Sequence, residues 1–588
     1  MNLPQKLEAL RALMHTHQLD YYLAPGTDPH QSEYMPAMWQ RRSFISEFDG
    51  SAGDVVIGLE KAYLWTDGRY ELQAKNQLNP AHYDFFISAQ GSDSSMNLFF
   101  AKQEAPVRLG VDPQLMSIAE AQNLEKCLKE SGGSLVFIKE NLIDLIEQPA
   151  AFKAQPICLL NLQYTGKPAE EKIKKLQQHL SHLQCDALVL SDLSCIAWLF
   201  NLRGEDIPYN PLFLSYALIS PETCTLFLNS DSLNPELTEY LYQLNVEIDE
   251  YATFYHEYGQ KNFKRLLLDP RKNNQALLTG THFKQVYFDT SPIDHWKSCK
   301  NDAEISGAIE AHRIDALAVI QFLHWLKKNG IGKTECGIAD KLLEFRQKNP
   351  QFKTPSFETI PGYADNGAIM HYHAHHGQDK TIGDQTLLLV DSGGQYLEGT
   401  TDITRTVHLG TPSTFEKECY TLVLKGHLAL RNARFNHGTR GEHLDVLARQ
   451  FLWKKGFNYG HGTGHGVGAY LCVHEGPQRI STAATTAPLL PGMIVSNEPG
   501  LYLSGRFGIR IENLLYIKTA DIESEFGPFY EFEDLTLVPY AHQLIAIELL
   551  SFEEITQINQ YHQKVWSTLY THLEGDVLEW LKHETSPL

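Results

Sequence analysis

Long apolar runs, paired cysteines and blocks of like charge are all missing from this 588-residue sequence. No stretch reaches the roughly 18 apolar residues expected of a membrane-spanning helix, and the first residues lack the apolar core of a signal peptide. The nine cysteines are scattered singly with no CxxC pair, which argues against structural zinc and disulfides and favours a reducing cytoplasm. The 50 basic and 71 acidic residues give a net charge of −21 without long runs of one sign. We therefore expect no nucleic acid and no membrane as a partner.

Within a globular composition, 43% hydrophobic and 21% charged, the N-terminal half carries the same pattern of elements twice. An amphipathic helix over residues 2–16 leads to the strand "DYYLAP" and then to two strands in "SAGDVVIGLEKAYLWTDGRY". A second amphipathic helix begins near Pro168 and again leads into strands joined by a turn. We predict two similar α/β domains that meet near residues 150–165, with two unrelated α/β domains as the alternative.

The third section of the chain opens with a helical pattern of about seven turns, "NDAEISGAIEAHRIDALAVIQFLHWLKKNG". Asp302 is the expected N-cap, and the apolar face includes Ile305, Ile309, Ile320 and Leu323. Helices and glycine-bounded strands follow. All concentrated patterns of histidine, aspartate and glutamate lie in this section, so we expect the chemistry here.

Two pairs of carboxylates lie in apolar strand patterns of this section. Asp391 ends an apolar run, and Asp402 opens a run in which alternate residues face opposite sides. Glu498 ends a second apolar run, and Glu512 lies in "GIRIENLL". A single aspartate after a strand is usually a turn or cap residue. Four carboxylates in apolar surroundings need a cation nearby, because burial and mutual repulsion both disfavour their charges.

The stretch "NYGHGTGHGVGAY" places two histidines four residues apart. A helix would direct His461 and His465 to one metal ion, but the alternating glycines from Gly460 to Gly468 each cost a helix about 1 kcal/mol relative to alanine. We expect instead a strand-like or irregular backbone that approaches the metal closely. His465 is then the only nitrogen ligand, and His461 lies outside the ligand set. Four carboxylates exceed the charge of one divalent ion, so we expect two ions, and an oxygen-rich set favours Mn²⁺, Mg²⁺ or Co²⁺.

These motifs, in their order along the chain, resemble a known enzyme family. The segments "VDSGGQYLEGTTDITRT", "HGTGHGVG", "VHEGP", "NEPG" and "GIRIEN" resemble the metallopeptidases that include aminopeptidase P, prolidase and methionine aminopeptidase. Near the N-terminus, "HQSEYMP", "FDGSAGDVVIG" and "WTDGRY" are similar to the long three-domain form of aminopeptidase P. The resemblance implies two similar N-terminal α/β domains followed by a C-terminal pita-bread catalytic domain of α+β type. We place these domains at residues 1–155, 156–299 and 300–588.

The resemblance implies the five metal ligands already found in the residues, together with groups that act on the substrate. The metal ligands are Asp391, Asp402, His465, Glu498 and Glu512. The groups implied for catalysis are Glu498, His371 and His474. The substrate-binding set is Arg69, His371, His465, His474 and Glu498. Without the resemblance, a lone histidine is more often a core residue and Arg69 a surface residue. We expect the other histidines of "HYHAHH", namely His373, His375 and His376, to lie in an exposed loop. Ser496 and Asn497 depart from the family pattern, in which threonine and an acidic residue are frequent before the glutamate.

The implied activity is hydrolysis of the N-terminal Xaa-Pro bond of peptides by a hydroxide that bridges two divalent ions. Mn²⁺ is the expected metal, with Co²⁺ and Zn²⁺ as alternatives, in a cytoplasmic homodimer. Three other readings stay open. A prolidase, limited to Xaa-Pro dipeptides, is disfavoured by the doubled N-terminal half. A metal-free creatinase-like enzyme is disfavoured by the complete ligand set, and a non-catalytic binding module by the same ligands and by the absence of an acidic tail.

Overall fold

The computed structural model describes residues 1–88 and 95–588, which divide into two compact units, Met1–Asp294 and His295–Leu588. Among the described residues, none of the helices combines the length and apolar character that crossing a lipid bilayer requires. The boundaries that we predicted after residues 155 and 299 stay predictions.

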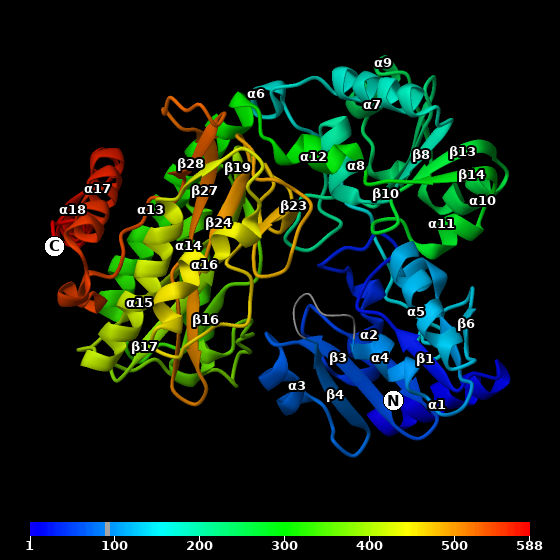
Figure 1. Cartoon of the computed structure of the whole chain (residues 1–588), viewed down its shortest axis with the longest axis horizontal. Helices are drawn as coiled ribbons and strands as arrows, with labels where there is room; N and C mark the ends of the chain where they lie inside the picture. The colour runs from blue at the N-terminus through cyan, green and yellow to red at the C-terminus, as the bar shows by residue number, and fades with distance from the viewer. Residues whose placement is uncertain (89–94) are drawn as a thin grey trace. The chain divides into compact units, whose positions relative to one another are not determined.

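The N-terminal unit contains two mixed sheets (Figure 1). The strands of the first sheet are β1 (Tyr21–Ala24), β2 (Asp54–Gly58), β3 (Ala62–Asp67), β4 (Tyr83–Ser88), β5 (Arg108–Val111) and β6 (Ser134–Phe137). Those of the second are β8 (Ala187–Leu190), β10 (Ser215–Ile219), β11 (Cys224–Leu228), β12 (Val246–Glu250), β13 (Asn262–Leu268) and β14 (His282–Phe288). Two short strands, β7 (Cys158–Leu159) and β9 (Leu202–Arg203), pair separately.

The two sheets have the same topology strand for strand. The first runs β4-β3-β2-β1-β5-β6 and the second β12-β11-β10-β8-β13-β14. In each sheet the second, third and fourth strands of this order pair with one another in antiparallel fashion. The first, fifth and sixth strands each pair in parallel with the preceding or following strand. The prediction of two similar α/β domains is therefore confirmed.

Helices flank these sheets (Figure 1). They are α1 (Leu3–Thr16), α2 (Arg41–Ser46), α3 (Glu71–Gln77), α4 (Ser95–Ala101), α5 (Ile118–Glu130), α6 (Leu162–Thr165), α7 (Ala169–Leu183), α8 (Leu193–Phe200), α9 (Pro235–Gln243), α10 (Phe254–Gly259) and α11 (Gln275–Thr279). Asn2 caps α1 by accepting a hydrogen bond from the Gln5 amide, and the predicted stripe from Leu3 to Met14 is buried. Helix α7 buries Ile173 and Leu176 in the same manner.

The C-terminal unit is built around a six-stranded sheet with the order β21-β28-β27-β24-β22-β23. Its strands are β21 (Arg434–Asn436), β22 (Gly464–Gly466), β23 (Glu475–Ile480), β24 (Ile494–Asn497), β27 (Asn513–Thr519) and β28 (Phe529–Asp534). The smaller sheets contain β15 (Phe352–Pro355), β16 (Ile360–Tyr363), β17 (Leu387–Ser392), β18 (Gly394–Tyr396), β19 (Gly399–Thr400), β20 (Ile403–His408), β25 (Gly500–Leu503) and β26 (Phe507–Arg510).

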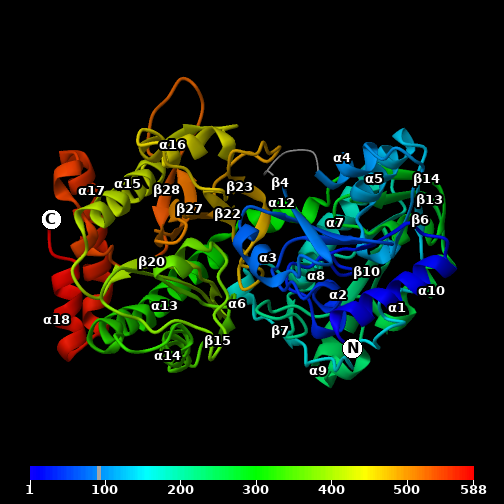
Figure 2. The same ribbon diagram turned by 90° about the horizontal axis from the view of Figure 1, so that it is seen from below.

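Helices flank these strands, and α12 (Pro292–Ser298) spans the division between the two units of the chain. The others are α13 (Asp302–Asn329), α14 (Glu335–Gln347), α15 (Thr414–Arg431), α16 (Gly441–Trp453), α17 (Phe552–Leu569) and α18 (Gly575–Glu584). In Figure 2 the strands β20, β27 and β28 lie between the helix pair α15–α16 and the helix pair α13–α14. Buried apolar residues of α13, α15 and α17 form one core with β17, β20 and β26.

Two details of α13 differ from the prediction. Asn301, not Asp302, is the N-cap, because its side chain accepts hydrogen bonds from the amides of Ala303 and Glu304. Ile309 is 45% exposed, because the buried face of the helix runs instead through residues such as Ala308.

Candidate metal centre

The four predicted carboxylates come from strands of the C-terminal unit that lie close together. Asp391 lies in β17, and Asp402 directly precedes β20, whose pairing with β17 sets Asp391 opposite Thr404. Glu498 directly follows β24, and Glu512 directly precedes β27, the antiparallel partner of β24. The amide of Glu512 donates to the carbonyl of Thr404 at 3.2 Å, which joins the two pairs of strands. Strand ends thus bring carboxylates from four separate segments to one place.

His465 lies in the strand β22, so the helical zinc motif is absent from this segment, as predicted. The neighbouring strands explain two of the glycines. A Cβ atom at Gly464 would lie 2.0 Å from the carbonyl oxygen of Ser496, and one at Gly466 would lie 2.0 Å from that of Glu475. The glycines therefore allow β23 and β24 to approach β22, whereas we had expected them to bring the backbone close to the metal.

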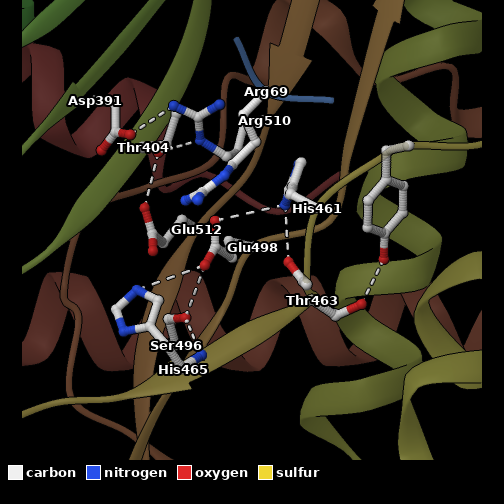
Figure 3. Close-up of polar contacts among 12 residues, drawn as sticks. Arg69, Asp391, Thr404, His461, Thr463, His465, Ser496, Glu498, Arg510 and Glu512 are labelled. Atoms are coloured by element: carbon white, nitrogen blue, oxygen red, sulfur yellow. Dashed lines mark hydrogen bonds and ion pairs between the residues drawn. The ribbon is translucent and has the colours of Figure 1, made fainter. Parts of the chain in front are cut away.

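The ligand atoms of all five predicted metal ligands gather in overlapping groups. Figure 3 shows four of these residues, Asp391, His465, Glu498 and Glu512. Within each group the atoms lie within 4.8 Å of one another. The groups are Asp391, Asp402 and Glu512; His465, Glu498 and Glu512; and Asp402, His465 and His474. Because the groups share members, they form one continuous cluster.

The imidazole of His465 is oriented toward the carboxylates. Its Nδ1 donates to the backbone carbonyl of Gly466 at 3.0 Å, which leaves Nε2 as the nitrogen for a ligand. Nε2 lies 3.4 Å from Asp402 Oδ2 and 3.5 Å from Glu498 Oε1. Burial works against protonation, but Asp402 and Glu498 outweigh it and raise the pKa of His465 to about 9. A positive charge is therefore strongly favoured at this point.

The carboxylates are buried close together, where burial and mutual repulsion disfavour their negative charges. Asp391, Asp402 and Glu512 are 8%, 4% and 2% exposed. Burial raises the pKa of Asp391 to about 6 even though Arg510 opposes this, and burial with the charge of Asp402 raises the pKa of Glu512 well above its usual range. Oδ1 of Asp391 and Oδ1 of Asp402 are buried with no hydrogen-bond partner among the described residues. Divalent cations relieve both the repulsion and the unpaired oxygens, so these residues fit a metal centre.

A chain of hydrogen bonds through Tyr502 and Arg510 connects His461 to the cluster. His461 Nε2 lies 2.8 Å from the hydroxyl of Tyr502, and Arg510 donates to the same hydroxyl at 2.7 Å. Arg510 in turn pairs with Asp391 at 2.5 Å and donates from Nε to Thr404 at 3.1 Å. His461 Nε2 is thus engaged with Tyr502, and its Nδ1 lies 3.8 Å from Glu498 Oε2 (Figure 3). That His461 lies outside the ligand set stays a prediction. The sequence signal for Arg510 is its alternation with Glu512, which sets both on one face.

Ser496, one of the two departures from the family pattern, links two of the ligands. Its hydroxyl donates to Glu498 Oε1 at 3.1 Å and accepts from the backbone amide of His465 at 2.9 Å. Asn497 turns the other way and donates to the carbonyl of His427 at 2.9 Å. The serine thus supports Glu498 in spite of the departure.

Arg405, which the sequence did not single out, holds the backbone of the ligand strands. It is 3% exposed, and its guanidinium donates to acceptors from several segments. These are the carbonyls of Thr404, Glu512, Val538 and Pro539, the Asn513 side chain and the hydroxyl of Tyr561. The C-terminal segment is therefore bonded to the strands that carry Asp402 and Glu512.

His474 directly precedes β23, and its ring lies 4.4 Å from that of His465 at an interplanar angle of 90°. Its neighbour Glu475 is anchored by two buried ammonium groups. Lys297 Nζ lies 2.9 Å from Glu475 Oε2, and Lys300 Nζ lies 2.7 Å from Oε1. Burial works in the opposite direction, yet these lysines hold the pKa of Glu475 below its usual range. The segment that carries His474 is thereby fixed in the interior.

Among the described residues, the grouped ligand atoms include neither His371 nor Arg69. His371 is half-buried between the 3₁₀ helix η5 (Ala364–Ala368) and β17. Arg69 belongs to the N-terminal unit, where Asp67 holds it bidentately at 2.9 and 2.7 Å. Of the loop histidines, His375 and His376 are exposed as predicted, whereas His373 is only partly exposed because it pairs with Glu358 at 3.0 Å.

Comparison with known protein families agrees with a metal centre in the C-terminal unit and two similar N-terminal domains. Residues 307–519 match the model of metallopeptidase family M24, and residues 528–588 match the C-terminal region of peptidase M24. Residues 6–145 and 147–304 each match a creatinase/prolidase N-terminal domain.

Named relatives cover the whole chain. A probable Xaa-Pro aminopeptidase P of Aspergillus flavus is 40% identical over 612 residues, which is 100% of this chain and 93% of the relative. The crystal structure of X-prolyl aminopeptidase from Caenorhabditis elegans, described as a cytosolic enzyme with a di-nuclear active site, has a TM-score of 0.95 and 34% identity over 100% of both chains. An Xaa-Pro dipeptidase from Bacillus anthracis has a TM-score of 0.50 and 25% identity, and covers 63% of this chain and 98% of its own.

Two creatinase-type domains are followed along the chain by a pita-bread catalytic unit with a carboxylate-rich centre for two divalent metals. This combination defines a metal-dependent aminopeptidase. Within that class, the 40% sequence identity to a probable Xaa-Pro aminopeptidase P over the whole chain shows the family. The chain belongs to the Xaa-Pro aminopeptidase P family. This confirms the fold and the enzyme class that the sequence predicts.

Proposed function

We propose that the chain removes the N-terminal residue from peptides with proline in the second position, using two divalent ions held by the five clustered ligands. The ligands are Asp391, Asp402, His465, Glu498 and Glu512. The observation that carries this assignment is the overlap of the ligand groups at one place, where buried carboxylate oxygens point without a hydrogen-bond partner in the described part of the chain. The names of the relatives support the Xaa-Pro bond as the substrate.

The donor set indicates the metal. Four carboxylates and one imidazole form an oxygen-rich set that suits Mn²⁺, with Co²⁺ and Zn²⁺ as alternatives. The carboxylates carry four negative charges, and Arg510 offsets one of them through Asp391. The chemistry supplied by two bound divalent ions in such a site is Lewis-acid activation of water and of a carbonyl group.

The side chains around the ligands have separate roles in the proposal. Glu498 accepts the proton of the attacking water, and the hydroxyl of Ser496 fixes its Oε1. His474 and His371 donate N–H groups to the carbonyl oxygen of the scissile bond as its negative charge develops. Arg69 binds substrate from the N-terminal unit. These three assignments rest on the family motifs, and for His474 also on its contact with His465.

We also propose a cytoplasmic homodimer. The scattered cysteines without a CxxC pair support a reducing compartment, and the relative from Caenorhabditis elegans is described as cytosolic. The dimer is supported by the family resemblance. A dipeptidase remains the second candidate, but the dipeptidase of Bacillus anthracis matches only 63% of this chain.

Metal content and peptide cleavage, read by mass spectrometry, test the proposal together. With Mn²⁺, Co²⁺ or Zn²⁺ supplied in turn, the protein should release arginine from Arg-Pro-Pro. Asp402→Asn should lower the metal content below two ions per chain and nearly abolish cleavage, because it removes a charge from the centre of the cluster. Asp521→Asn, at an exposed position of the same unit, is the control and should change neither. Full metal occupancy with normal turnover in Asp402→Asn would refute the ligand assignment, and cleavage of Gly-Pro alone would favour the dipeptidase.

A further inference from the structure

A small interior cavity lies behind Asp402, on the side of helix α13. Its lining includes His312 and Ala316 of α13, Asp402 and Thr536, and all of these residues are buried. The space open to the centre of a water molecule is about 10 Å³, which corresponds to a single water. Most of the accessible lining is apolar, but His312, Asp402 and Thr536 bring polar groups to it, whereas voids lined by apolar groups alone stay dry.

His312 presents an unpaired nitrogen in this part of the core. The residue is 3% exposed, and its Nδ1 donates to the carbonyl of Ala308 at 2.7 Å. Burial lowers the pKa of His312, so the ring is neutral and Nε2 is an acceptor. Nε2 is buried and has no hydrogen-bond partner among residues 1–88 and 95–588. Buried polar atoms are nearly always paired, either with protein or with an ordered water.

Asp402 and Thr536 complete the set of partners that one water needs. Each oxygen of the Asp402 carboxylate has two lone pairs, so it can accept from a water as well as bind a metal. The Thr536 hydroxyl accepts from the Leu514 amide at 2.8 Å, which leaves its own hydrogen to donate. A water that donates to His312 and Asp402 and accepts from Thr536 makes three hydrogen bonds, the usual number for a buried water.

We propose that one buried water bridges His312 Nε2 and the carboxylate of Asp402, and that His312 is thereby a positioning residue for this metal ligand. The proposal rests on the assignment of Asp402 as a ligand in the proposed function. The water and His312 hold Asp402 from behind, while His465 faces it at 3.4 Å on the metal side. Groups that orient a ligand in this way commonly change metal affinity about 10–100-fold when they are removed.

Two variants separate the water from the ring that binds it. His312→Leu removes the acceptor, and Ala316→Val fills the cavity while His312 remains. Titration of Mn²⁺ into the metal-free proteins by calorimetry should show binding weakened about tenfold or more in both variants, because both displace the water. His312→Gln should retain most of the affinity, since its amide oxygen can still accept from the water. His324→Leu is the matched control in the same helix, also with an unpaired ring nitrogen, and should bind Mn²⁺ as the unmodified protein does.

A crystal structure of the Mn²⁺-loaded protein provides the second measurement. Density for a water within hydrogen-bond distance of His312 Nε2 and the Asp402 carboxylate is the expected result. An empty cavity, or equal Mn²⁺ affinity in His312→Leu and His324→Leu, overturns the proposal. Mn²⁺ binding by Asp402→Asn tests the proposed function separately from the role of His312. If that variant binds two Mn²⁺ ions normally, then Asp402 is not a ligand, whatever His312 does.

Discussion

Replacement of Glu475 by glutamine removes the one carboxylate that two buried lysines share. The side chains of Lys297 and Lys300 are 2% and 1% exposed, and their ion pairs with Glu475 measure 2.9 and 2.7 Å. Breaking one buried pair costs about 3–5 kcal/mol, because the remaining charge is left uncompensated. Lys300 keeps its bond to the carbonyl of Lys297 at 2.8 Å, so we expect the total to stay near that range. For a unit of this size, the unfolding temperature should then fall on the order of 10 °C.

The pH dependence of this loss follows from the direction of the pKa shift. The pKa of Glu475 is lower in the folded protein than in the unfolded chain, so its stabilisation is complete above the unfolded pKa, about 4.3, and declines as the pH falls through the folded value. The difference in stability between the unmodified protein and Glu475→Gln should therefore narrow on acidification below about pH 4.3.

Scanning calorimetry of the metal-free proteins measures the effect without interference from metal binding. A second substitution, Lys300→Met in the Glu475→Gln background, should recover part of the stability because it removes one of the two uncompensated ammonium groups. Glu418→Gln is the matched control. Its ion pair with Lys455 has an N–O distance of 2.8 Å but lies at the surface, where such pairs contribute little to stability. A loss below about 1 kcal/mol in Glu475→Gln, or no recovery in the double variant, would refute the reasoning.

Three further results are expected. His465→Ala should lose bound metal, whereas His461→Ala should retain it, as measured by elemental analysis; the opposite outcome would exchange their roles. His474→Ala should keep both metals and lower kcat about 10²-fold on an Xaa-Pro-Yaa tripeptide, because one donor to the developing oxyanion is lost, and a rise in KM alone would make it a plain binding residue. Burial lowers the pKa of His562 to about 3, so the unfolded chain takes up the proton first. Stability should therefore fall between pH 6.5 and 3, by on the order of 5 kcal/mol at most. In His562→Gln this part of the acid dependence, followed by denaturant unfolding, should disappear, and an unchanged pH profile would contradict it.

Local patterns predicted much of this fold. Helices α1 and α7 and the hairpin β2–β3 follow directly from apolar spacing, because the burial of one face depends only on neighbours within a few turns. The topology repeated in the N-terminal unit was visible as a repeated order of elements. The N-cap of α13 was misplaced by one residue because Asn301 and Asp302 are both good capping residues, and Ile309 was misplaced because spacing alone does not show which side meets solvent.

The charged side chains of the site could be predicted from the sequence, but the residues that hold the surrounding backbone in place could not. Asp391 and Asp402 were recognisable because carboxylates at the ends of apolar runs conflict with their surroundings. The partners of Arg405 and Lys300 were not recognisable, since Tyr561 lies 156 residues from Arg405 and Glu475 lies 175 residues from Lys300. Contacts over such separations depend on strand order, which no local pattern encodes.

The bonds of Arg405 have a consequence for chains that end early. A frameshift or premature stop upstream of Val538 would delete three of its acceptors, the carbonyls of Val538 and Pro539 and the hydroxyl of Tyr561. The guanidinium would keep its bonds to Thr404, Glu512 and Asn513, but its Nε would be buried without the Pro539 acceptor, at a cost of about 1–3 kcal/mol. A product that ends between Glu512 and Val538 would retain every proposed ligand and catalytic side chain, yet we expect the backbone around Asp402 and Glu512 to be less stable.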